Sequence, residues 1–149
     1  MDGYRFAPSV VHRAAIVFCF ASLMLLFRPA GADTAAVESA LFTSAQAERG
    51  RLLYDEHCVT CHGARLEGNP AAPLAGPAFL GRWADGQHTL DDLFYIIRSQ
   101  MPYNEPGKLT KQQYADVLAY VLKANGYAAG EAELPPGGAA LKKITLSPR

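Results

Sequence analysis

Cys58-Val59-Thr60-Cys61-His62 holds two cysteines three positions apart, with a histidine directly after the second. If this stretch is helical, positions i, i+3 and i+4 share one face, so both thiols and the imidazole point the same way. Two such thiols can bond the two vinyl groups of a haem, and the imidazole can then reach the iron. The spacing C-x-x-C-H is typical of covalent haem attachment. It therefore predicts one haem c, bound through Cys58 and Cys61 and ligated by His62.

Two other uses of the cysteine pair stay open. A thiol–disulfide redox pair is expected in a βαβ context, whereas the residues before Cys58 look helical and no β-branched run lies nearby. A structural zinc site needs four ligands. Apart from the motif, the chain after residue 32 offers only His57 and His88 as nitrogen ligands, and no third cysteine. Haem attachment is therefore the favoured interpretation.

Residues 1–32 have the three parts of a secretory signal peptide. Arg5 and Arg13 precede an apolar run over 14–27, and Ala30-Gly31-Ala32 then supplies an A-x-A cleavage site. The apolar run is shorter than the roughly 20 residues that span a bilayer, so a retained anchor is the weaker alternative. We therefore expect export to the periplasm and no stable membrane insertion.

The expected mature chain is one small domain with nearly balanced charge. Cleavage after Ala32 leaves 117 residues, of which 11 are basic and 13 acidic. This composition does not indicate nucleic-acid binding or a polybasic membrane contact. We expect a flexible N-terminus over 33–43, a domain over 44–126, and an extended tail over 127–149, which contains Pro135-Pro136-Gly137-Gly138.

Three segments have the periodicity of helices, at about 44–62, 89–100 and 111–125. In the second, apolar residues recur at the spacing of one helix face, and Thr89 can cap its N-terminus. Thr110 can cap the third segment in the same way. These patterns predict an all-α fold with three main helices.

The segment between His62 and Thr89 does not fit a helix pattern. It holds five glycines and three prolines, but also Leu66, Phe79 and Trp83. A loop of this length in a compact domain is usually functional or disordered, and the apolar side chains argue against disorder. We therefore expect the loop to wrap around the haem, which supplies apolar core that three helices alone would lack.

In these features the chain resembles the class I cytochrome c family, over about 46–125. In that family a methionine in the loop before the C-terminal helix is the second iron ligand, which implies Met101. The resemblance also implies that Gly50 and Tyr54 on the first helix pack against Tyr120 on the last. The fold it implies is the small cytochrome c fold around one covalent haem.

Met101 also stands out on its own. A lone methionine usually fills a gap in a core, but Met101 is the only methionine after residue 32 and precedes Pro102 at the expected end of a helix. We therefore expect Met101 to be the sixth iron ligand. His88 is the rival, although a loop or surface role is expected for it.

The resemblance implies further haem contacts. A proline-rich turn in the family supplies a backbone carbonyl that accepts the ring N–H of the histidine ligand. In Pro73-Leu74-Ala75-Gly76-Pro77 we expect Pro73 to supply this carbonyl and Leu74 to pack on the haem face. The side chains expected to hydrogen-bond the haem propionates are Arg82, Trp83, Tyr103 and Asn104.

Histidine and methionine ligation leaves no open iron position, so the expected function is single-electron transfer without catalytic residues. An enzyme that binds peroxide or a gas at the haem stays open, because it requires only that Met101 leaves the iron. The stretches around Met101-Pro102-Tyr103 and Asn125-Gly126-Tyr127 look most like cytochromes that accept electrons from periplasmic quinoprotein dehydrogenases. This likeness implies a dehydrogenase as donor and a terminal oxidase or another carrier as acceptor.

Overall fold

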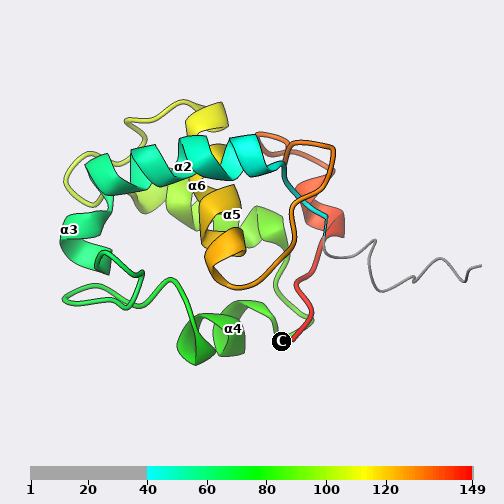
Figure 1. The fold of residues 1–149 in the computed structure, drawn as a ribbon, viewed down its shortest axis with the longest axis horizontal. Coiled ribbons are helices and arrows are strands. Elements are labelled where there is room, and N and C mark those ends of the chain that lie inside the picture. Colours follow the sequence, from blue (N-terminus) through cyan, green and yellow to red (C-terminus); the bar gives the residue numbers. More distant parts are fainter. Residues whose placement is uncertain (1–39, 149) are drawn as a thin grey trace, which may run out of the picture. The chain divides into compact units, whose positions relative to one another are not determined.

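The computed structural model describes residues 40–148, which are helical and contain no strand (Figure 1). The all-α fold class is therefore confirmed. The expected signal peptide and residues 33–39 lie outside the described residues. Within 40–148, no helix has the length and apolar character that a membrane span requires. The helices are α2 Ser44–His57, α3 Val59–His62, α4 Pro77–Trp83, α5 Leu90–Gln100 and α6 Lys111–Ala124, followed by the 3-10 helix η1 Leu141–Lys143.

The first predicted helix is interrupted at Cys58. The φ and ψ angles of this residue, −122° and −31°, end α2 at His57, and a single turn, α3, follows. The turn keeps the register of the motif, because the backbone N–H groups of Cys61 and His62 both donate to the carbonyl of Cys58, at 3.2 Å and 3.0 Å. The two cysteines and the histidine therefore still lie on one turn.

The second and third predicted helices are found within a residue of their expected bounds. Thr89 accepts a hydrogen bond from the N–H of Asp92 at 3.3 Å, and Thr110 accepts one from the N–H of Gln113 at 3.2 Å. Both N-termini are complete capping boxes, since the Asp92 and Gln113 side chains accept from the cap backbones in return. Local capping chemistry thus determines where α5 and α6 begin.

The segment between His62 and Thr89 is not a continuous loop, because α4 lies within it. This helix begins with Pro77 in its first turn, where the missing N–H of proline costs no hydrogen bond. Its Phe79 and Trp83 side chains are buried in the core. The prolines and glycines of this segment predicted only a loop, so α4 was not predicted.

Helices α2 and α6 cross with their backbones in close contact at Gly50. A Cβ atom at this position would overlap the carbonyl group of Asp116, so only glycine fits. One turn further along each helix, the rings of Tyr54 and Tyr120 pack with centroids 5.3 Å apart. The expected pairing of Gly50 and Tyr54 with α6 is confirmed, with the backbone contact at Asp116 rather than at Tyr120.

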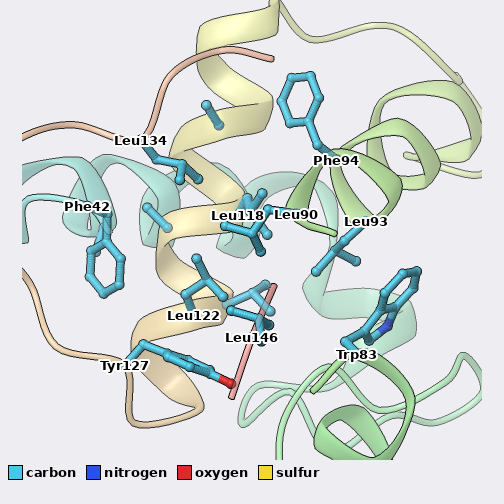
Figure 2. Packing of buried hydrophobic residues seen from close by; sticks show 14 of the residues in the cluster. Phe42, Trp83, Leu90, Leu93, Phe94, Leu118, Leu122, Tyr127, Leu134 and Leu146 are labelled. Carbon is cyan, nitrogen blue, oxygen red and sulfur yellow. The ribbon is translucent and has the colours of Figure 1, made fainter. Parts of the chain in front are cut away.

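The C-terminal segment 127–148 is irregular, but it is part of the core. Tyr127, Leu134, Leu141 and Leu146 are each at most 3% exposed. Figure 2 shows Tyr127, Leu134 and Leu146 packed around α6 with the side chains of α5. At the other end of the described chain Phe42 is fully buried. These residues therefore contribute to the core, which the sequence did not indicate because their apolar side chains have no regular spacing and give no helix or strand pattern.

Candidate haem site

The turn that carries the motif is fastened at both ends. The N–H of Cys58 donates to the carbonyl of Tyr54 at 2.9 Å, and the hydroxyl of Tyr54 donates to the carbonyl of Gly63 at 2.6 Å. Tyr54 therefore bonds to the residue before α3 and to the residue after it. Because Tyr54 is fully buried against α6, it holds the turn in a fixed position on the helix pair.

Cys58 and Cys61 carry free thiols; Cys58 is half-buried and Cys61 is exposed. Burial raises the pKa of the Cys58 thiol to about 11, and the neighbouring Cys61 adds to the shift. Thiol–disulfide catalysts need a cysteine whose pKa is lowered, so that the thiolate is present at neutral pH. The environment of Cys58 raises the pKa of its thiol instead, and therefore does not favour a thiol–disulfide function.

The imidazole of His62 is buried and has one ring nitrogen engaged. Its Nδ1 lies 2.8 Å from the carbonyl oxygen of Ala72. A carbonyl can only accept, so the proton is on Nδ1 and the lone pair of Nε2 is free to bind a metal. The acceptor is one residue before the expected Pro73. The reason is that the N–H of Ala71 donates to Cys61 at 3.0 Å, which brings Ala72 opposite the ring.

Asn125 ties the turn around Leu74 to the end of α6. Its side chain donates to the carbonyl of Leu74 at 2.9 Å and accepts the N–H of Gly76 at 3.0 Å. Leu74 packs against the hydrophobic core, and its own N–H donates to Leu66 at 2.8 Å. Sequence reasoning missed Asn125, whose only signal was a polar residue at a helix C-terminus.

Met101 forms the C-cap of α5 and is half-buried. The Tyr114 hydroxyl, which comes from α6, donates to the Met101 carbonyl at 2.6 Å. The phenol oxygen also accepts the N–H of Leu109 at 3.4 Å. Tyr114 is not among the residues that the sequence singles out, and no motif indicates this contact.

The remaining predicted side chains lie in different environments. Trp83 is buried, with the Arg82 guanidinium 5.2 Å above its ring centre. Tyr103 is 85% exposed, and Asn104 next to it is also exposed.

His88 lies in an exposed turn after α4. Its ring meets Trp83 edge-on, with the centroids 5.2 Å apart, and its Nδ1 is 2.8 Å from the carboxylate of Asp85. The backbone N–H groups of His88 and Gln87, with the imidazole of His88, lower the pKa of Asp85 to about 2. Asp85 is therefore ionised at neutral pH and orients His88 on the surface.

A protein-only zinc site finds no support in residues 40–148, where no three His, Cys, Asp or Glu side chains gather as metal ligands. The donor set does fit a covalently attached haem. One turn carries the thiols of Cys58 and Cys61 and the imidazole of His62, whose Nε2 is free. The thioether of Met101 lies at the end of α5.

One comparison with known proteins identifies a family for this chain. The family model described as cytochrome c oxidase, cbb3-type, subunit III matches residues 45–121, just over half of the chain. Comparisons with curated proteins and with solved structures give no match. The chain therefore belongs to this family of mono-haem cytochrome c domains, which bind haem c covalently and serve in electron transfer.

Proposed function

We propose that the protein is a periplasmic carrier of single electrons, with its haem bound to Cys58 and Cys61 and its iron ligated by His62 and Met101. The observation that carries the proposal is the environment of His62. Its Nδ1 is engaged by Ala72, so Nε2 is free, and the same turn holds both cysteines. The bound haem supplies the one-electron couple, and the residues of the chain determine how it is held.

Each residue has a distinct part in this proposal. The two cysteines fix one edge of the ring covalently, and the carbonyl of Ala72 makes the imidazole of His62 a stronger ligand. The Met101 thioether closes the remaining iron position. A histidine–methionine pair raises the reduction potential and excludes small ligands, which suits a carrier better than an oxygen- or peroxide-reducing enzyme.

The location and the partners rest on sequence features. The signal peptide expected in residues 1–32 supports export to the periplasm. The likeness around Met101-Pro102-Tyr103 supports a quinoprotein dehydrogenase as the donor. The family description names a subunit of a terminal oxidase, which supports an oxidase, or a carrier leading to one, as the acceptor.

A visible spectrum of the protein produced with a haem-attachment system tests the proposal. We expect a low-spin c-type spectrum with the weak red absorption of a methionine–iron bond, and a mass increased by one haem. A high-spin spectrum would instead indicate an open iron position and favour an enzyme. A protein with no haem band would favour a thiol function for the cysteines.

A further inference from the structure

We propose that Tyr114 is a positioning residue that holds the segment 101–109 closed and thereby limits how often the Met101 thioether leaves the iron. The inference rests on the proposed ligation by Met101. Tyr114 lies in the first turns of α6 and does not belong to the haem-binding motif. Its hydroxyl would act through the backbone of Met101.

The contacts of Tyr114 join the two ends of this segment. The buried phenol, 1% exposed, donates to the Met101 carbonyl at 2.6 Å and accepts the Leu109 N–H at 3.4 Å. The N–H of Gly107 points at the same Met101 carbonyl, at 3.4 Å. One oxygen atom thus closes a loop whose first residue carries the thioether.

Within the segment, Pro102 is buried and Leu109 packs against the core. Residues 103–108 are exposed, and their hydrogen bonds stay within the segment, such as the one from the Lys108 ammonium to Glu105 at 2.7 Å. In the part of the chain that the structure describes, no other side chain from outside the segment hydrogen-bonds to it. The hydroxyl of Tyr114 is therefore placed to control the opening of this loop.

The expected size of the effect follows from the hydrogen bond. We expect its loss to raise the population in which Met101 is off the iron about fivefold, which corresponds to about 1 kcal/mol. An added ligand can bind the iron only when Met101 has left. Its apparent affinity should therefore rise by the same factor.

The experiment compares two tyrosine variants of the haem-loaded protein, Tyr114→Phe and Tyr127→Phe. Tyr127 is a matched control, because it is 3% exposed and its hydroxyl also donates to a backbone carbonyl, that of Ser147, at 2.9 Å. The measurements are the apparent affinity for imidazole, the red methionine–iron absorption and the amide exchange rate of Leu109. We expect Tyr114→Phe to bind imidazole about fivefold more tightly, to lose the red absorption at a lower temperature and to exchange the Leu109 amide faster. Tyr127→Phe should lower the melting temperature without these changes.

The double variant Met101→Ala with Tyr114→Phe separates the two proposals. With Met101 absent, the loss of the Tyr114 hydroxyl should no longer alter imidazole affinity. If Met101→Ala opens the iron but Tyr114→Phe binds imidazole like the parent protein, the positioning role is overturned and the ligation stands. If both tyrosine variants raise the affinity equally, general loosening explains the effect and the positioning role is again overturned. If Met101→Ala alone leaves the spectrum unchanged, the ligation fails and the role of Tyr114 fails with it.

Discussion

The side chain of Gln46 pairs with the main chain of Leu134 as one strand residue pairs with another. Its Nε2 donates to the Leu134 carbonyl at 2.9 Å, and its Oε1 accepts the Leu134 N–H at 2.7 Å. Gln46 is fully buried, and Leu134 is 1% exposed. The first turn of α2 therefore satisfies both main-chain groups of a buried residue in the C-terminal segment, which explains how an irregular segment can belong to the core.

Replacing Gln46 with leucine should cost a large part of the domain's stability. The change would leave the N–H and the carbonyl of Leu134 buried without partners, at about 1–3 kcal/mol for each group. Urea unfolding of the haem-loaded protein measures the loss. Gln87→Leu is the matched control, because Gln87 is exposed and its side chain makes no hydrogen bond within the part of the chain that the structure describes. Equal midpoints for the two variants would show that the Gln46 pair does not hold the segment.

The contact between α2 and α6 leads to a second prediction, at Gly50. Gly50→Ala should destabilise the protein by about 1–3 kcal/mol, because the added methyl group must push the helices apart. Gly81→Ala provides the contrast, since a Cβ atom there meets nothing within 4 Å. Alanine favours a helix more than glycine does, so Gly81→Ala should be neutral or stabilising by up to about 1 kcal/mol. The melting temperature should therefore fall in Gly50→Ala and stay the same or rise in Gly81→Ala. A Gly50→Ala protein as stable as its parent would contradict the close crossing.

Fold prediction from the sequence succeeded where local chemistry determines structure. Helices α5 and α6 have a periodic apolar face and a threonine cap at Thr89 and Thr110, and both were predicted within a residue. Helix α4 was not predicted because its first turn begins with Pro77, and proline is also common in loops. The burial of the C-terminal segment was not predicted either. Leu134, Leu141 and Leu146 pack against residues far away in the sequence, and no local pattern indicates those contacts.

In the candidate site, too, the features set by local sequence were predicted and the long-range contacts were not. Cys58, Cys61 and His62 are neighbours in the chain, so their common turn follows from their spacing. The hydrogen-bond partner of the His62 ring depends on the path of the backbone after the motif. That path places the carbonyl of Ala72, rather than that of Pro73, opposite the ring. The contact between Tyr114 and Met101 joins two helices, and no spacing in the sequence indicates it.

The cysteines and the histidine of the motif lead to a prediction about maturation. Cys58→Ser or Cys61→Ser should remove one thioether bond and lower the yield of covalently haem-loaded protein by about tenfold or more, and His62→Ala should remove the buried ligand with the same result. His57→Ala is the control, because His57 precedes the motif and its Nε2 lies 3.5 Å from the carboxylate of Glu56. Haem-stained denaturing gels and visible spectra measure the yield. Normal amounts of covalent low-spin haem in a motif variant would refute the assignment.

The iron ligation gives the last prediction. Met101→Ala should open the sixth position, so the haem becomes high-spin or takes up water, loses the weak red absorption and binds carbon monoxide or cyanide readily. Met101→His should keep the haem low-spin and lower its midpoint potential by on the order of 100 mV, because an imidazole stabilises ferric iron better than a thioether does. His88→Ala is the matched test of the rival ligand. The ring of His88 is held on the surface by Asp85 and Trp83, so its removal should leave the spectrum and the potential unchanged. If Met101→Ala keeps the parent spectrum and potential while His88→Ala changes both, His88 is the iron ligand and Met101 is not.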